Sequence, residues 1–160
     1  MASLTEDCYV THNTLVIERS YRQSPERVFQ AFADPVKKRR WFAEGPNHDL
    51  ELFEMEFRVG GAERYRSRFR EGSPFPGVAL TSDGNYLDIL PNCRIIIAST
   101  MSLGDRRISA ALVTFEFIPE GGGTKLTLTH QAAFFEGSGG PEMREAGWRK
   151  LLDQLGSELG

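Results

Sequence analysis

The chain has only two cysteines in 160 residues, Cys8 and Cys93, and they lie far apart in the sequence. Such a pair excludes a disulfide framework and a cysteine-based zinc site, and a reducing compartment would keep both residues as thiols. The three histidines, His12, His48 and His130, also lack the spacing of metal ligands. We therefore expect no metal ion and no other cofactor.

Long apolar runs are missing as well. The longest aliphatic stretch, Ile95 to Ala98, is far too short to span a membrane, and Met1 to Thr14 contains no apolar core of a secretory signal. The formal net charge of −3 gives no reason to expect a polyanionic partner. The sequence therefore predicts a cytoplasmic protein that neither inserts into membranes nor binds nucleic acid.

The most informative segment lies between Leu15 and Phe42. Apolar and polar residues alternate from Leu15 to Tyr21, which predicts a half-buried strand. Ser24 followed by a proline is the start signal of a helix, because the hydroxyl accepts from a first-turn amide and proline has no N–H to leave unpaired. Asp34, again followed by proline, predicts a short second helix that ends at Trp41 and Phe42.

The rest of the chain predicts an antiparallel meander followed by one long helix. We expect residues 1–13 to be a flexible segment and residues 14–160 to form a single domain. Further strands are predicted at residues 50–57, 62–69, 78–90, 94–101, 108–118 and 124–132. A helical period begins at Pro141, with Trp148, Leu151, Leu152, Leu155 and Leu159 on one stripe.

Four later motifs carry a resemblance to a known family. They are V-G-G from Val59, G-N-Y-L-D-I-L-P from Gly84, G-T-K-L-T-L-T-H from Gly123 and G-W-R-K-L-L-D-Q-L from Gly147. In this order, after the opening strand and helix, they resemble the single-domain form of the family named for the activator of the heat-shock-protein-90 ATPase, in the SRPBCC or START-like superfamily. The resemblance implies an α+β helix-grip fold, in which a curved antiparallel sheet of about six or seven strands wraps around a long C-terminal helix and two short helices follow the first strand.

A strongly bent sheet with one helix across its mouth leaves an apolar cavity wherever large side chains do not fill the space. Most buried aromatic residues simply pack in a core, so each candidate below also has that simpler explanation. The residues that we expect to line the cavity and contact a ligand are Trp41, Phe53, Phe57, Tyr65, Phe69, Tyr86, Phe115, Phe117, His130, Trp148 and Leu152.

His130 is the most interesting titratable residue. It shares a strand face with Leu126 and Leu128, so the imidazole lies on the apolar side. There it could orient a polar group of a ligand, act as an acid or base, or simply hydrogen-bond a neighbouring group. No serine or cysteine nucleophile accompanies it in a recognisable motif, so we assign no catalytic residue and leave enzymatic activity open. Gly147, inside the predicted helix, indicates either a close backbone contact or free space.

Three polar segments have simple structural interpretations. The arginines of residues 64–70 point away from the aromatics between them, which favours a solvated charge ladder opposite Glu54 and Glu56 over a nucleic-acid site. Residues 37–40 are two lysines and two arginines, expected on the exposed side of the short helix, where they could alternatively bind an acidic ligand head. Residues 136–141 are expected to form a flexible segment leading into the last helix rather than an anion cradle.

These observations favour a binding module that holds a small apolar or amphipathic molecule between its sheet and its C-terminal helix. One alternative is an enzyme that uses the same cavity, as polyketide cyclase-like members of the superfamily do. Another is a chaperone ATPase activator of the stress response, as the family name implies. The eukaryotic activator has a separate N-terminal chaperone-binding domain, however, and here only about a dozen residues precede the first strand. An open sheet edge would also allow a homodimer.

Overall fold

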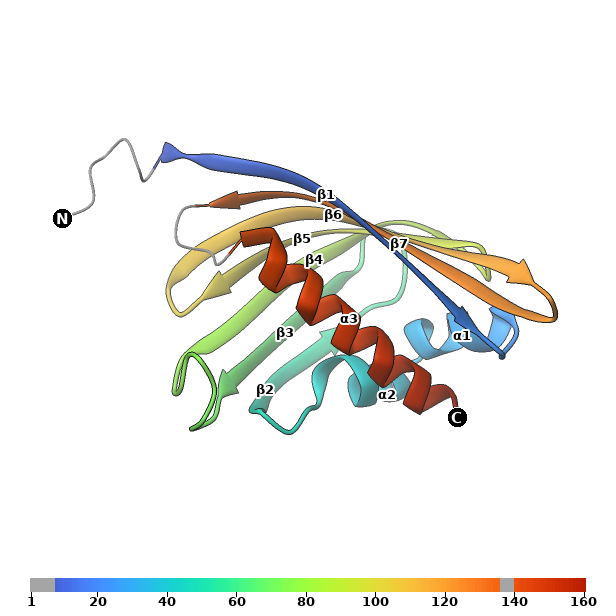
Figure 1. The fold of residues 1–160 in the computed structure, drawn as a ribbon, viewed down its shortest axis with the longest axis horizontal. Coiled ribbons are helices and arrows are strands. Elements are labelled where there is room, and N and C mark those ends of the chain that lie inside the picture. The colour runs from blue at the N-terminus through green and yellow to red at the C-terminus, as the bar shows by residue number, and fades with distance from the viewer. Residues whose placement is uncertain (1–7, 136–139) are drawn as a thin grey trace.

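Seven antiparallel strands form one sheet in the order β1-β7-β6-β5-β4-β3-β2, and all helices lie on one side of it (Figure 1). The computed structural model describes residues 8–135 and 140–160. The strands are β1 Val10–Tyr21, β2 His48–Met55, β3 Ala62–Phe69, β4 Ala79–Leu90, β5 Arg94–Leu103, β6 Arg106–Glu120 and β7 Gly123–Phe135. The helices are α1 Pro25–Ala33, α2 Pro35–Lys38, the π-helical turn η2 Arg39–Ala43, and α3 Gly140–Leu159. The predicted α+β helix-grip fold is confirmed.

The start of β1 differs from the prediction. Val10–Asn13, expected to belong to a flexible segment, pairs with Ala132–Phe135 of β7. The backbone hydrogen bonds of a long neighbouring strand therefore extend β1 beyond the alternating residues that identify it in the sequence. The predicted segment 136–141 lies for the most part outside the described residues.

Both helix start signals act as predicted. The Ser24 hydroxyl accepts a hydrogen bond from the Arg27 amide at 3.3 Å, and the Asp34 carboxylate accepts one from the Val36 amide at 2.9 Å. Phe29 and Phe32 of α1 pack edge-on against Phe117, with ring centroids 5.4 and 5.2 Å apart. The short helices are thereby held against the sheet at one end of the molecule.

The long helix α3 crosses the inner face of the sheet, where it contacts η2, β1, α1 and β7 (Figure 1). Leu152, Leu155 and Leu159 of its C-terminal half are buried. The Tyr21 hydroxyl donates to the Leu152 carbonyl at 2.8 Å, and the Gln154 side chain donates to the Trp41 carbonyl at 2.7 Å. These contacts hold the C-terminal half of α3 tightly against the rest of the domain.

The charge ladder on β2 and β3 is present, and its carboxylates differ only in part from those expected, because the register places Glu54 opposite Arg64 as predicted. The register between the strands shifts at residues 50–52, and Glu51 accepts hydrogen bonds from both Arg66 and Arg68 at 3.0 Å. The predicted partner Glu56 instead pairs with Arg58, the next arginine along the chain, at 2.8 Å. A β-bulge changes which side chains face each other across the strands, and alternation alone does not reveal it.

Gly147 does not make the close backbone contact that we considered. A Cβ atom at this position would meet no heavy atom within 4 Å. The residue is exposed on α3, one position before Trp148. The interpretation as a contact glycine is wrong, and the free space beside it is available to an added methyl group.

Replacing Gly147 by alanine should therefore stabilise the protein. We expect the free energy of unfolding to rise by about 0.5–1 kcal/mol, because alanine loses less backbone entropy than glycine in a helix interior. Urea denaturation of the two proteins measures the change. Gly61→Ala is the opposite control, because its Cβ would lie 2.0 Å from the Glu56 carbonyl oxygen and should destabilise the fold. A destabilised Gly147→Ala protein would contradict the prediction.

Candidate functional site

The candidate site begins with small side chains on the inner face of the sheet. Strand register aligns Ser99, Ala111 and Ala132 across β5, β6 and β7, and the next inward row places Met101, Ser109 and Phe134 side by side. These residues share the face of the buried Ile97, Val113 and His130, because side chains two positions apart on a strand point the same way. One inward row, Ser99, Ala111 and Ala132, therefore consists of small side chains only, whereas the next row carries the larger Met101 and Phe134.

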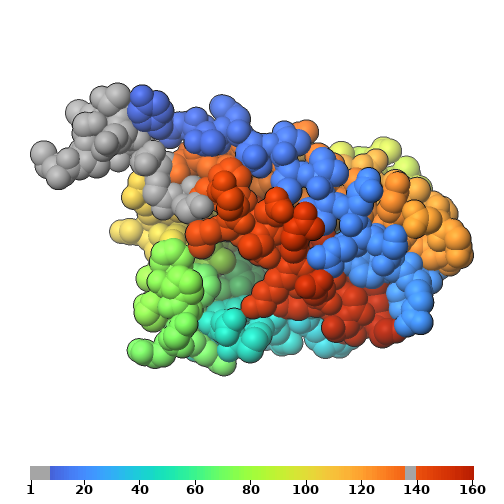
Figure 2. All heavy atoms as spheres, in the orientation of Figure 1, coloured from blue at the N-terminus to red at the C-terminus, as the bar shows by residue number. Residues whose placement is uncertain are grey.

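Aromatic rings stand above this floor on the side of β2 and β3. Trp148 of α3 lies 5.6 Å from Phe115 and 6.1 Å from Phe42, measured between ring centroids. Phe42 in turn lies 6.1 Å from Phe53 and 5.9 Å from Tyr65. Phe42, Phe53 and Trp148 remain half-buried. Figure 2 shows a recess in this face of the molecule, between the N-terminal half of α3 and the segment that follows β3.

The other predicted site residues belong mainly to the closed core. Phe57 packs against Phe29 and Tyr86, and Phe69 packs against Phe75 near the end of β3. The predicted residues that are at most 3% exposed are Trp41, Tyr86, Phe115, Phe117, His130 and Leu152. The structure thus brings Phe53, Tyr65 and Trp148 around Phe42, and places His130 separately on β7, beside Phe134 and Arg144 of α3.

Arg144 is the functional residue that sequence reasoning missed. Its guanidinium donates to the Ser109 hydroxyl at 2.7 Å, contacts Nε2 of His130 at 3.3 Å, and lies over the Phe134 ring at 5.1 Å from the centroid. It precedes Trp148 by one helical turn, on the same face of α3. The sequence could have identified Arg144 by its position, because it continues the apolar stripe of the helix toward the N-terminal end.

Arg144, Ser109 and His130 form a polar cluster. Its positive charge has no matching carboxylate in residues 8–135 and 140–160. No ion pair of Arg144 occurs in this part of the chain, and burial lowers its pKa to about 10, so it remains a cation at neutral pH. Burial, and secondly the Arg144 charge, lower the pKa of His130 to about 4. His130 is therefore neutral, and its Nδ1 has no hydrogen-bond partner within the described chain.

A second buried cation has a different environment. Nζ of Lys38 lies 2.5 Å from a carboxylate oxygen of Glu63, and both residues are buried. The Tyr86 hydroxyl donates to the same carboxylate, and both burial and the Glu63 charge raise the pKa of Tyr86. Lys38 Nζ also lies 4.8 Å from the centroid of the Phe42 ring. This pair forms one wall behind the aromatic rings.

The expectation that residues 37–40 all face solvent is therefore wrong for Lys38. Its neighbours Lys37, Arg39 and Arg40 are exposed. Lys38 turns toward the sheet because α2 packs against it, and the Glu63 carboxylate compensates the buried charge. Only the tertiary fold brings these two residues together.

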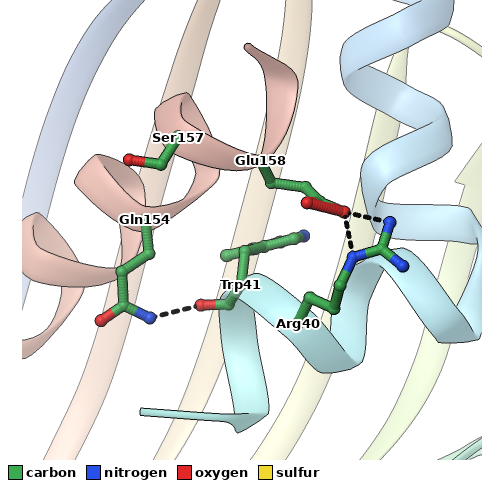
Figure 3. Close-up of a pocket in the computed structure, with 5 residues that line it drawn as sticks. All are labelled: Arg40, Trp41, Gln154, Ser157 and Glu158. Atoms are coloured by element: carbon green, nitrogen blue, oxygen red, sulfur yellow. Dashed lines mark hydrogen bonds and ion pairs between the residues drawn. The ribbon is translucent and has the colours of Figure 1, made fainter. Parts of the chain in front are cut away.

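A separate surface pocket of about 280 Å³ lies between η2 and α3, lined by Arg40, Trp41, Gln154, Ser157 and Glu158 (Figure 3). Arg40 pairs with Glu158 at 2.5 Å, and Gln154 donates to the Trp41 carbonyl. Both interactions join polar groups across the contact between η2 and α3. We interpret this pocket as part of the packing of α3 rather than as a ligand site.

No helix among residues 8–135 and 140–160 is both long and apolar enough to cross a membrane. Nor does that part of the chain bring together three or more histidine, cysteine, aspartate or glutamate side chains that could hold a metal ion.

Comparisons with known proteins agree with the fold. The model of the family described as "Activator of Hsp90 ATPase homolog 1-like protein" matches residues 22–160. A solved structure of an uncharacterized protein from Rhizobium leguminosarum is 39% identical, with a TM-score of 0.87, and the match covers 94% of this chain and 96% of that one. A protein from Rhizobium loti is 43% identical, with a TM-score of 0.81 and coverage of 94% and 99%. No curated protein matches the sequence.

The lowered pKa of His130 makes the stability of the fold depend on pH. A histidine that titrates near its ordinary 6.5 when unfolded and near 4 when folded binds more protons in the unfolded state, so stability is complete above pH 6.5 and falls as pH decreases toward 4. Between pH 7.5 and pH 5 we expect the free energy of unfolding of the wild-type protein to fall by about 2 kcal/mol more than that of the His130→Gln variant. Urea denaturation at both pH values tests this, and equal losses would contradict it.

Removing one partner of the Lys38–Glu63 pair should lower the free energy of unfolding more than removing both charges together. Lys38→Met leaves a buried carboxylate without its counter-charge, and we expect it to lower the free energy of unfolding by about 3 kcal/mol or more. Lys38→Met combined with Glu63→Gln should recover at least half of that loss. As a control, Asp49→Ala removes the exposed partner of Arg70 and should cost less than about 1 kcal/mol. If the double variant lost as much free energy of unfolding as the two single variants added together, this coupling would be contradicted.

Proposed function

The chain belongs to the Activator of Hsp90 ATPase homolog 1-like family of the SRPBCC superfamily, and we propose that it binds a small, mostly apolar molecule between the inner face of its sheet and α3. The observation that supports this most directly is the position of the half-buried rings of Trp148, Phe42 and Phe53. On the same inner face, strand register aligns the small side chains of Ser99, Ala111 and Ala132 in one row, and we propose that the ligand lies between this row and the rings.

The energetics favour an apolar occupant. Removing apolar surface from water is worth about 25 cal/mol per Å², so a ligand that covers about 200 Å² of aromatic surface would gain about 5 kcal/mol before the costs of association. The C-terminal half of α3 has no comparable space, because Leu152, Leu155 and Leu159 are buried there. We therefore place the ligand beneath the N-terminal half of the helix.

The environment of His130 supports binding rather than acid–base catalysis. Its Nε2 accepts a hydrogen bond from the Arg144 guanidinium, so in the neutral ring the proton lies on Nδ1. Neither ring nitrogen then has a free lone pair with which to take a proton from a substrate. We propose a binding role for this histidine, with no chemical step assigned to it.

A variant that fills the space tests the proposal. Ala111 lies on the inner face of β6, and phenylalanine at this position would fill the row of small side chains between Val113 and Ser109. We expect Ala111→Phe to weaken binding of the neutral probe N-phenyl-1-naphthylamine about tenfold or more, measured by fluorescence titration. Leu112→Phe is the matched control, because the neighbouring side chain is exposed on the opposite face of the same strand.

Two results would contradict the proposal. One is wild-type protein that does not bind the probe, and the other is Ala111→Phe protein that stays folded and binds it as tightly as wild type. Mass spectrometry of the purified protein, under native and then denaturing conditions, would identify any molecule that accompanies it. Thermal unfolding of both variants shows whether a change in binding reflects a change in stability.

A further inference from the structure

Arg144 is placed where a structural arginine would be expected to have a counter-charge. Of the other arginines that contact α3, Arg19 and Arg40 pair with Asp153 and Glu158, whereas Arg27 donates to the Leu159 carbonyl near the end of the helix. Arg144 hydrogen-bonds only neutral groups, Ser109 and His130, within the part of the chain that the structure describes. A guanidinium has five N–H donors, and these two contacts leave most of them unused.

His130 adds an independent sign of a missing acceptor. The residue is 2% exposed, and apart from an interaction with its own backbone the ring Nδ1 lacks a hydrogen-bond partner among residues 8–135 and 140–160. Because Nε2 accepts from Arg144, Nδ1 carries the proton and is a buried donor. An unpaired buried donor costs about 1–3 kcal/mol, so native structures rarely keep one without a purpose.

The backbone of α3 increases the local positive potential. Arg144 lies in the first turns of the helix that begins at Gly140, near the end that carries the positive partial charge of the helix dipole. A cation there is unfavourable for helix stability, whereas a bound anion would be stabilised by both the guanidinium and the dipole. The arrangement therefore favours an anionic group over a neutral one.

We propose that the ligand is an apolar monocarboxylate, whose carboxylate accepts hydrogen bonds from Arg144 and whose apolar body lies beneath Trp148 toward Phe42. This inference rests on the proposed function and names the chemical class of its ligand. A single guanidinium with neutral neighbours matches one negative charge, whereas a phosphate dianion would leave charge uncompensated. Planar bidentate contact with a carboxylate is also the geometry that arginine favours.

The position of Arg144 relative to Trp148 fits such a ligand. The two side chains are four residues apart on α3 and so lie about 6 Å from each other along one face. Beyond Trp148, the Phe42 ring lies 6.1 Å away by centroid distance and continues the apolar wall. A molecule with a charged head and an apolar body would contact the polar cluster and the rings at the same time.

A matched pair of ligands tests the charge requirement. Octanoate and octan-1-ol share their alkyl chain and differ in the head group, and each can be titrated against protein loaded with N-phenyl-1-naphthylamine. We expect wild-type protein to bind octanoate about tenfold more tightly than octan-1-ol. Arg144→Met should abolish this preference while leaving the affinity for octan-1-ol within about twofold of wild type.

Arg149→Met is the control for charge on the same helix, because Arg149 is exposed and pairs with Glu145. It should keep the preference for octanoate. Should Arg144→Met fail to fold, Arg144→Lys retains the charge without the planar fork, and a reduced but measurable preference for octanoate is expected. The comparison of the two ligands in wild-type protein does not depend on any variant.

The outcomes separate this inference from the proposed function. If the probe and octan-1-ol bind but octanoate binds no more tightly, the carboxylate inference is overturned and the apolar site stands. If Arg144→Met weakens both ligands equally, the arginine supports the shape of the site and the inference is again overturned. If neither the probe nor either ligand binds wild-type protein, the proposed function fails together with the inference.

Discussion

The fold depends on one constraint: a single helix must cover the inner face of a seven-stranded sheet. A helix of 20 residues is about 30 Å long, which matches the width of seven strands, but it is only about 10 Å across. It can therefore bury one diagonal band, and α3 buries that band against η2, β1, α1 and β7. The short helices close one end of the face, and the remaining corner keeps small side chains below and half-buried rings above.

Lys38, which is buried, and Arg144, which is partly buried, differ in how their positive charge is compensated. Lys38 has a carboxylate partner in Glu63 and a hydroxyl from Tyr86 beside it, so its charge is compensated within the fold. Arg144 has a hydroxyl and a neutral imidazole, and no carboxylate in the described chain. The first arrangement is complete without a ligand, whereas the second is the one on which the proposal of an anionic ligand rests.

Local signals predicted much of the architecture. Ser24 and Asp34 mark helix starts because a cap acts within one turn, and the alternation in β1 survives because strand faces repeat every two residues. Failures arose where distant residues decide. The bulge near Glu51 brought a carboxylate into the charge ladder that alternation had not indicated, and the buried Glu63 carboxylate pairs with Lys38. Of the predicted site residues, His130 contacts Arg144 and Trp148 lies one helical turn from it, and the sequence alone did not distinguish Arg144 from the other charged residues of the long helix.

The sequence by itself determined the element order, the helix-grip fold and the family, because these follow from caps, alternation, turn residues and the order of short motifs. It also placed His130 on the apolar face. Only the tertiary structure decided which aromatic rings are closed in the core, which lysine is buried, and that Arg144 lies beside His130 and Ser109. The physical reason is that burial and charge pairing depend on contacts between segments far apart in the chain, and these contacts exist only after α3 has packed across the sheet.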